Sequence, residues 1–180
     1  MDLRQTSLPG VIEIHPSPHR DDRGHFARTY CADTFAAAGL EPVTAQMALS
    51  HNRLRGTLRG LHVIPEPIGE AKLVRCVRGS AFDVAVDLRP GSATFGRWTA
   101  VELSADNLVA LYLPKGVAHG FLTREDATDI AYQFSAAHRP GVETGIRWDD
   151  RDIGIDWPFA PVVMSDRDRA LPHLCDGAVG

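Results

Sequence analysis

The sequence predicts an all-β protein, a jelly-roll sandwich or barrel of antiparallel strands. Short β-rich runs recur about every ten residues between Gly and Pro turns, which is the spacing of such folds. In the run AFDVAVDL (81–88), apolar residues alternate strictly with small or acidic ones. Phe82, Val84, Val86 and Leu88 therefore share one face, which predicts a strand that is buried on one side only.

Each strand is expected where a β-rich run lies between turn signals. The first run follows an amino end of mixed acid, base and proline, and a polar turn over 19–24 separates it from the second. The expected strands are 11–14, 26–30, 44–51, 57–63, 72–78, 81–88, 97–103, 108–113, 118–122 and 128–134.

One short helix is expected over 32–38, because this segment is rich in alanine. Asp33 or Thr34 can cap its first turn, and Gly39 can end it. After 138–141 the alternation fades, so the remaining chain is expected to form a packed, irregular C-terminal tail.

Length and charge limit the possible functions. With 180 residues, 44% of them hydrophobic, the chain is expected to form one domain over 1–180 around a single core. A net charge of −4 and the lack of a Lys/Arg run argue against nucleic-acid binding. Neither a signal peptide nor an apolar run of about 18 residues is present, which predicts a cytoplasmic protein without membrane contact. Three cysteines without metal-type spacing suit a reducing compartment.

Two basic clusters indicate a pocket. The segment 58–62 (LRGLH) contains Arg59 and His62, and Lys72 opens the strand that follows it. A similar turn, 114–121, contains His119. If the strands close into a barrel, these side chains converge, although a single arginine is often only a solvated charge and a single histidine only a satisfied neighbour.

Seven motifs closely resemble the dTDP-4-dehydrorhamnose 3,5-epimerase family over about residues 8–174. The motifs are LRGLH (58–62), KLVRCVRG (72–79), FDVAVDLR (82–89), TFGRW (94–98), LSADN (103–107), LYLPKGVAHGF (111–121) and GIRWDD (145–150). The resemblance implies a cupin-type jelly roll and a homodimer that exchanges amino-terminal strands. It also implies epimerisation of a dTDP-linked 4-keto-6-deoxyhexose without a metal or another cofactor.

The resemblance also assigns site residues. It implies that His62 is the base, Tyr132 the acid and Asp168 the carboxylate that orients the base. Asp83 is a further acidic position that lines the pocket, as a secondary candidate. The implied substrate contacts are Arg23, Gln46, Arg59, Lys72, His119, Glu143 and Arg167.

Epimerisation next to a ketone requires a base, an acid and a positive charge near the carbonyl oxygen. A proton α to a ketone is far less acidic than an imidazolium, so a base alone is insufficient, and Lys72, Arg59 or His119 is expected to stabilise the enolate oxygen. Inversion needs an acid and a base on opposite faces of the sugar, roles that His62 and Tyr132 can fill. Tyr132 has an alternative role as a core residue, since it shares a strand face with other apolar side chains.

Arginine side chains are the expected diphosphate ligands, because their forked donors match phosphate oxygens. Arg23, Arg59 and Arg167 are the candidates. Arg23 follows the polar turn, and its two interpretations are a solvated hairpin residue and an anion contact in a neighbouring subunit.

Several positions depart from the family pattern. His138 stands where the family has a tyrosine that stacks on the nucleobase, Arg28 where it has glutamate, and Ala48 where it has asparagine. Val63 and Ile64 replace an aromatic residue and a glutamine. The departures predict retained chemistry on an altered substrate, in a specialised deoxysugar pathway, with inversion at C3, at C5 or at both.

Two other functions remain open. The first is a cupin that binds a sugar nucleotide without catalysis, although an acid and a base on opposite faces would then have no use. The second is a metal-dependent cupin enzyme in which His62 and His119 are ligands. That class places two histidines one residue apart with a glutamate close behind, whereas this chain continues from His62 as Val63-Ile64-Pro65-Glu66.

Overall fold

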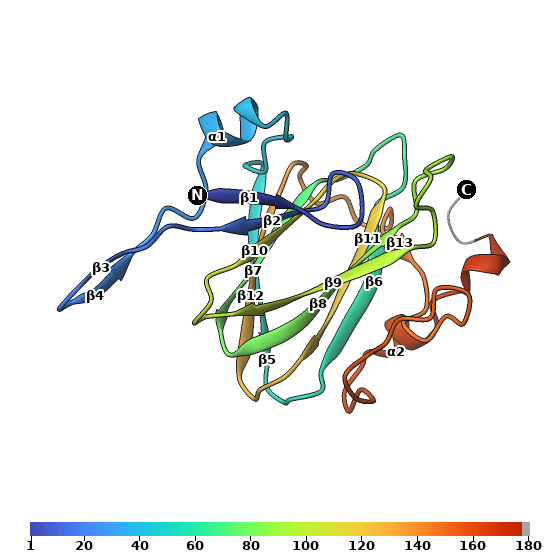
Figure 1. The fold of residues 1–180 in the computed structure, drawn as a ribbon. Coiled ribbons are helices and arrows are strands. Elements are labelled where there is room, and N and C mark those ends of the chain that lie inside the picture. Colours follow the sequence, from blue (N-terminus) through green and yellow to red (C-terminus); the bar gives the residue numbers. More distant parts are fainter. Residues whose placement is uncertain (178–180) are drawn as a thin grey trace.

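Two antiparallel sheets packed face to face form the molecule, so the predicted all-β jelly roll is confirmed (Figure 1). The computed structural model describes residues 1–177. The first sheet contains β1 (Asp2–Gln5), β2 (Ile12–His15), β10 (Ala110–Leu113), β7 (Lys72–Arg78), β12 (Thr128–Phe134) and β5 (Gln46–Asn52), in that spatial order. The second contains β13 (Thr144–Gly145), β6 (Leu58–Val63), β11 (Val117–Thr123), β8 (Ser80–Asp87) and β9 (Trp98–Ser104).

Five short elements lie outside the two sheets. They are β3 (His19–Asp21), β4 (Gly24–Phe26), α1 (Ala32–Ala37), α2 (Asp166–Arg169) and the 3-10 turn η1 (Leu174–Asp176). Within residues 1–177, no helix has both the length and the apolar character needed to cross a bilayer.

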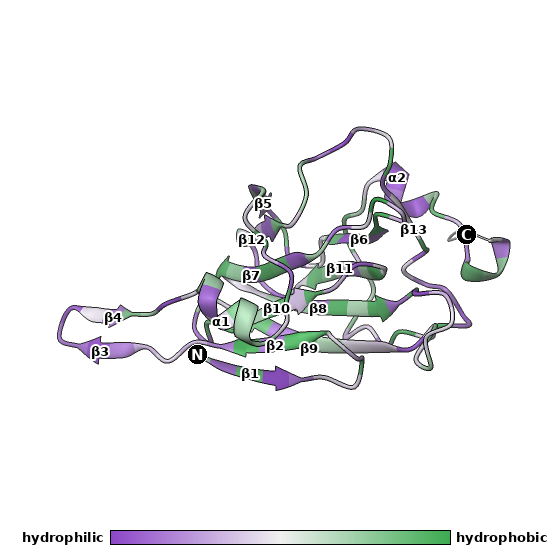
Figure 2. Cartoon of the chain, turned by 90° about the horizontal axis from the view of Figure 1, so that it is seen from above, coloured by the Kyte–Doolittle hydropathy of each residue, from purple (hydrophilic) through white to green (hydrophobic). Residues whose placement is uncertain are grey.

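The main core lies between the sheets. Val74 and Leu111 contribute to it from the first sheet, and Ala85 and Phe121 from the second. Figure 2 shows hydrophobic residues along the central strands, whereas the β3–β4 hairpin and α2 are largely hydrophilic. The apolar residues of this core fill one part of the space between the sheets. The polar inward-facing residues of the candidate site, described below, lie in the remaining part.

The prediction that β8 is buried on one side only is wrong. Its alternating face packs against the C-terminal tail, where Val84 and Val86 share a cluster with the buried Ile153 and the half-buried Trp157. The other face of β8 enters the core between the sheets. The small and acidic residues that alternate with the apolar ones in β8 are buried as well. The alternating pattern therefore suggested an exposed face, although the C-terminal tail buries one face and the first sheet the other.

The predicted strand over 26–30 is also wrong, because β4 ends at Phe26. Residues 19–21, which were assigned to a polar turn, form β3, and the two strands make a hairpin that projects from the sandwich (Figure 1). Residues 27–31 pair with no strand in the described chain, so the ladder stops there. The side chain of Phe26 is left 77% exposed.

Helix α1 lies close to its predicted position but is not capped by Asp33 or Thr34. Its N-cap is Cys31, whose side chain makes no capping bond. Phe35 is fully buried and packs edge-on against Tyr112, with ring centroids 5.8 Å apart. The helix is therefore held by packing against the outer face of the first sheet rather than by a cap.

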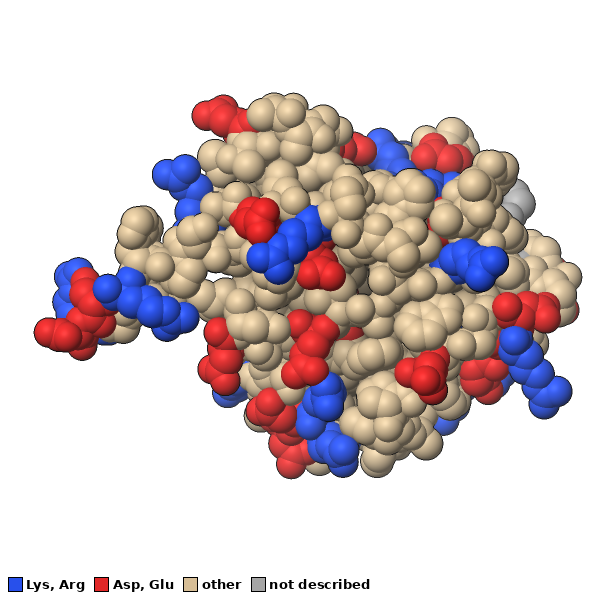
Figure 3. All heavy atoms as spheres, in the orientation of Figure 1, with Lys and Arg blue, Asp and Glu red and all other residues tan. Residues whose placement is uncertain are grey.

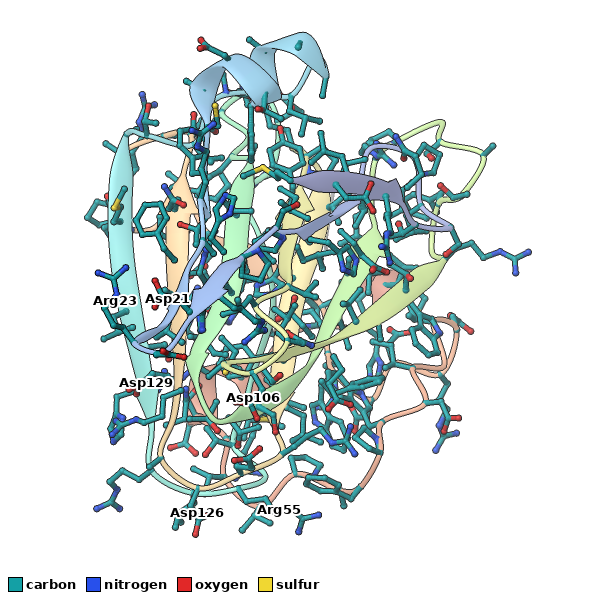
Figure 4. All side chains as sticks on the ribbon, turned by 60° about the vertical axis from the view of Figure 1, so that its left-hand side comes forward. Asp21, Arg23, Arg55, Asp106, Asp126 and Asp129 are labelled. Carbon is teal, nitrogen blue, oxygen red and sulfur yellow. The ribbon has the colours of Figure 1, made fainter. Side chains whose placement is uncertain are left out.

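The end of the sandwich opposite α1 is closed by loop contacts (Figure 4). The backbone N–H of Arg55 donates to Asp126 over 2.6 Å, and the Arg55 guanidinium lies 4.1 Å from the ring centroid of Phe159. These contacts join the β5–β6 loop to the β11–β12 loop and to the tail. Acidic and basic side chains are interspersed on the face drawn in Figure 3, so the net charge of −4 is not concentrated in one patch there.

Candidate active site

A β-bulge in β6 turns two functional side chains toward the space between the sheets. In the pairing of β6 with β11, His62 lies opposite His119 and Arg59 lies opposite Phe121, so β6 contains one extra residue. Without this residue, a spacing of three would place Arg59 and His62 on opposite faces. Gly60 permits the bulge, because a Cβ at this position would lie 2.6 Å from the Cα of Gly120.

His62 is oriented by Asp168 from the tail. The Nε2 atom of His62 lies 2.8 Å from Oδ1 of Asp168, and the backbone N–H of Gly60 donates to Oδ2 over 3.3 Å. Helix α2 presents this carboxylate, and Ser165 caps the helix by accepting from the Asp168 N–H. Burial raises the pKa of Asp168, but the hydrogen bonds from His62 and Gly60 outweigh burial and hold that pKa below its usual value.

The pairing with Asp168 defines the tautomer of His62. An ionised carboxylate only accepts hydrogen bonds, so Nε2 is the N–H and Nδ1 retains the lone pair. Nδ1 lies 3.7 Å from Glu143, which is too long for a hydrogen bond. Glu143 instead accepts from Arg167 over 2.6 Å. The structure thus brings Asp168, Glu143 and Arg167, all expected from the family resemblance, to the same histidine.

A second histidine and carboxylate pair faces Tyr132. His119 Nε2 lies 2.8 Å from Oδ1 of Asp83, which is fully buried, and Oδ2 of Asp83 has no partner among the described residues. The ring centroids of His119 and Tyr132 are 5.9 Å apart, in edge-on contact. Burial raises the pKa of Tyr132 well above its usual range, and the charge of Asp83 raises it further. Tyr132 therefore keeps its proton at neutral pH.

Lys72 enters the same region from β7. It lies opposite Phe134 of the neighbouring strand, and its ammonium is 6.0 Å from the Phe134 ring centroid. Phe134 in turn stacks on Tyr132, with ring centroids 5.7 Å apart and an interplanar angle of 3°. A carboxylate oxygen of Glu70 lies 3.5 Å from the Lys72 ammonium. The lysine thus sits beside the acid candidate, with a carboxylate partner that was not among the predicted site residues.

Gln46 and His138, both predicted to contact the substrate, contact each other. The backbone N–H of His138 donates to the side-chain oxygen of Gln46 over 2.7 Å, so Gln46 holds the segment that carries His138. Arg59 is held by Asn52, which accepts from its Nε over 2.8 Å. Ala48 lies opposite Tyr132 across the β5–β12 pair and leaves space beside the ring.

Arg23 is the one predicted site residue that stays apart from the others in this chain. It lies at the tip of the projecting hairpin, where its guanidinium is 2.6 Å from Asp21 and its side chain is 90% exposed (Figure 4). The pairing with Asp21 raises the pKa of Arg23.

Three supporting residues were missed by sequence reasoning. Glu70 precedes Lys72 by two residues, and this acid and base spacing was a usable signal. The Ser165-x-x-Asp168 spacing was another, since it is typical of a helix start. Asn52 gave no signal, because its contact with Arg59 depends on the bulge in β6.

Two further observations concern metals and thiols. Among residues 1–177, no three His, Cys, Asp or Glu side chains are grouped as ligands for a metal ion. Cys31, Cys76 and Cys175 are free thiols, and burial raises the pKa of Cys76 to about 11.

Known proteins match almost the whole chain. A model of the dTDP-4-dehydrorhamnose 3,5-epimerase family matches residues 5–176. A dTDP-4-dehydrorhamnose 3,5-epimerase from Methanothermobacter thermautotrophicus is 45% identical over 97% of this chain and 95% of its own. A dTDP-4-dehydrorhamnose 3-epimerase from Streptomyces niveus is 40% identical, with 94% and 82% covered. The structure of NovW, a 4-keto-6-deoxy sugar epimerase from Streptomyces spheroides, is 40% identical, has a TM-score of 0.93, and is matched over 98% of this chain and 89% of its own.

Proposed function

Because this chain belongs to the dTDP-4-dehydrorhamnose 3,5-epimerase family, we propose that His62, Tyr132 and Lys72 carry out its proton transfers. The protein is an isomerase, an epimerase of a dTDP-linked 4-keto-6-deoxyhexose. The observation that carries the assignment of roles is the cross-strand pairing of His62 with His119, whose ring contacts Tyr132. The proposed proton acceptor and the proposed proton donor thus come from different sheets and lie on either side of His119.

In the proposed reaction, Nδ1 of His62 takes the proton from the carbon next to the C4 ketone. The electron pair of the broken C–H bond forms a C=C double bond, and the π pair of the carbonyl moves to its oxygen. The ammonium of Lys72 stabilises the resulting enolate charge. Tyr132 then donates its hydroxyl proton to the opposite face of the same carbon, which restores the ketone with inverted configuration. One proton leaves the sugar and one returns, so the sugar gains and loses no atoms. The enzyme is restored when the imidazolium of His62 releases its proton to water and the phenolate of Tyr132 takes one from water. Asp168 stabilises the imidazolium that forms on His62.

The nucleotide would be held by cations and by the segment around His138. Arg59 and Arg167 have guanidinium groups suited to phosphate oxygens. Arg167 is bound to Glu143 over 2.6 Å, so phosphate binding would compete with that ion pair. His138 is exposed and would stack on the nucleobase, while Gln46 fixes its backbone.

The substrate is proposed to come from a specialised deoxysugar pathway, with inversion at C3, at C5 or at both. Ala48 and His138, two of the departures from the family pattern, lie next to Tyr132 and to the Gln46 contact, respectively. They lie beside the proposed catalytic groups without replacing them. A 3-epimerase among the relatives supports the possibility that one carbon alone is inverted.

The chain is proposed to act as one domain, in a homodimer that exchanges its amino-terminal hairpin. Exposed apolar residues support this assembly. Phe26 of the hairpin is 77% exposed, and Met47 and Leu49 on the outer face of β5 are 70% and 63% exposed. A hollow of about 630 Å³ lies beside Met47 and Leu49. In such a dimer, Arg23 of the hairpin could reach the partner's site. A cytoplasmic location is proposed because the three cysteines are free thiols.

Solvent deuterium exchange tests the proposed roles. The enzyme is incubated in deuterated buffer with dTDP-4-keto-6-deoxyglucose, and the label is located by NMR or mass spectrometry. We expect label at C3, at C5 or at both in the wild type, and no label with His62→Ala, while dTDP binds both proteins equally. Near-normal exchange by His62→Ala would remove it as the base.

The same assay separates the two rival functions. Tight dTDP binding with no exchange by the wild type would favour a binding protein without catalysis. Stoichiometric metal in the purified wild type, with exchange lost on chelation and restored by the metal, would favour a metal-dependent cupin enzyme.

A further inference from the structure

A buried carboxylate accompanies the lysine of the proposed site. One carboxylate oxygen of Glu70 lies 3.5 Å from the ammonium of Lys72, and the two side chains are only 7% and 8% exposed. This is the only ion pair that Lys72 makes with the described residues. Removing a charge from water is costly unless it is paired, so Glu70 offsets the cost of burying the ammonium.

The pair lies close to the proposed acid. Lys72 faces Phe134, the ring of Phe134 stacks on Tyr132, and Tyr132 is the side chain that would return the proton. A lysine side chain has four rotatable carbon bonds and can place its charge at many points. A contact with a neighbouring group is therefore needed to hold the ammonium next to the carbonyl oxygen of the sugar.

Two further charged groups act on Glu70. Burial raises the pKa of Glu70, the ammonium of Lys72 lowers it, and the carboxylate of Glu143 raises it again, with His138 a smaller opposing influence. Glu143 and His138 both belong to the segment next to the proposed nucleotide site. Glu70 therefore lies close enough to this segment to be affected by its charges.

We propose that Glu70 is a positioning residue that holds the ammonium of Lys72 against the carbonyl oxygen of the sugar. The proposal rests on the proposed function, because it assumes that Lys72 stabilises the enolate. Glu70 itself would touch neither the reacting carbon nor the oxygen. Its effect should therefore appear in the rate of proton transfer and not in nucleotide affinity, and it should require Lys72.

A double-mutant cycle tests this inference. Deuterium exchange and dTDP affinity are measured for Glu70→Ala, Lys72→Met and the double variant. We expect Glu70→Ala to lower kcat for exchange by about tenfold or more, since a small misplacement of a catalytic group is costly, with dTDP affinity unchanged. In the Lys72→Met background, Glu70→Ala should cause no further loss.

Two more variants serve as controls. Glu66→Ala removes the same charge from an exposed position four residues earlier and should leave kcat unchanged. Glu70→Gln keeps an oxygen that can accept from the ammonium, so it should restore part of the rate, and it replaces Glu70→Ala if that variant does not fold.

The outcomes are distinguishable. Equal losses from Glu70→Ala with and without Lys72, or a loss of dTDP affinity without a loss of kcat, would overturn the role of Glu70 alone. Wild-type exchange by Lys72→Met would overturn both the role of Lys72 and that of Glu70. Exchange that depends on Lys72, and on Glu70 only when Lys72 is present, would support both.

Discussion

The imidazole of His62 lies between two carboxylates at unequal distances. Asp168 is 2.8 Å from Nε2, and Glu143 is 3.7 Å from Nδ1. Only the first distance allows a hydrogen bond, so Asp168 alone selects the tautomer. Glu143 is already bound to Arg167, and it adds negative potential near the nitrogen that would accept the proton.

Replacing Asp168 by asparagine tests the tautomer argument. The amide of Asp168→Asn can donate to Nε2 and favour the tautomer with its proton on Nδ1, so we expect exchange to fall by about two orders of magnitude. Deuterium uptake measures this loss. Asp166→Asn on the exposed side of α2 is the matched control and should exchange at the wild-type rate. A loss of less than about twofold for Asp168→Asn would contradict the argument.

His138 is where this chain departs from the family tyrosine. Because tyrosine offers a larger ring for stacking, we expect His138→Tyr to tighten dTDP binding by about fivefold, which corresponds to roughly 1 kcal/mol. Titration calorimetry with dTDP measures the change. His138→Ala should bind more weakly than the wild type, and unchanged affinity in both variants would show that the nucleobase lies elsewhere.

At the level of residues, resemblance to a family was more informative than pattern. The reaction type alone predicts that a base, an acid and a cation are present, but it does not identify His62 rather than His119 as the base. Asn52 was not identified, because its contact with Arg59 joins two strands and depends on the bulge in β6. Glu70 was missed although its position two residues before Lys72 was a signal. The bulge at Gly60 has no mark in the sequence beyond a glycine, yet it decides where Arg59 points.

Among the elements, the turn after β8 concentrates the most hydrogen bonds on one side chain. Asp87 is fully buried and accepts from the Arg89 guanidinium and from the hydroxyls of Ser92 and Thr94. Burial raises the pKa of Asp87, but these donors outweigh burial and hold that pKa far below its usual value. The carboxylate therefore stabilises the fold while it is ionised.

The pH dependence of stability follows from the sign of this shift. A pKa lowered by folding contributes stability above the unfolded-state value of about 3.9, and the contribution is lost as the pH falls toward the folded-state pKa. We expect Asp87→Asn to lower the free energy of unfolding at neutral pH by about 1–3 kcal/mol.

Urea unfolding at several pH values measures the difference between Asp87→Asn and the wild type. The difference should shrink as the pH is lowered below about 4. Asp106→Asn, at an exposed position (Figure 4), should change little at any pH. A difference that grows in acid would reverse the sign of the argument.

The elements were predicted well where periodicity and turn residues agreed. The strands at 72–78 and 128–134 were predicted with their full bounds, and seven others were predicted to within one or two residues. The strand at 26–30 was wrong, and the short strands at 2–5, 19–21 and 144–145 were not predicted. The errors arose where tertiary contacts decide. The tail covers β8, α2 has only four residues, and β4 ends where neighbouring strands are lacking within residues 1–177.

On the scale of the whole molecule, the outer face of β5 is unusually apolar for an exposed edge strand. Met47 and Leu49 project from it, and Phe26 projects from the hairpin. Exposed apolar patches of this kind mark interaction surfaces. The proposed homodimer would place a second copy of this chain on this surface.

A charge at this surface tests the proposed homodimer. We expect the wild type to sediment as a dimer and Leu49→Asp to shift toward the monomer, because an unpaired carboxylate would be buried at the interface. Analytical ultracentrifugation measures the shift. Val162→Asp, on the C-terminal tail and 69% exposed, should remain dimeric. A wild type that sediments as a monomer at all concentrations would exclude the assembly.

The contact between His62 and Asp168 joins residues that are 106 positions apart. During synthesis the histidine leaves the ribosome well before the carboxylate that orients it, and β-strands between them can already pair. A nascent chain can therefore pair its central strands while the proposed proton acceptor still lacks the carboxylate that orients it. Turnover would begin only after the C-terminal tail with Asp168 has docked on β6. Enzymatic activity would therefore indicate that the tail has been synthesised and has folded, and not only that the sheets have formed.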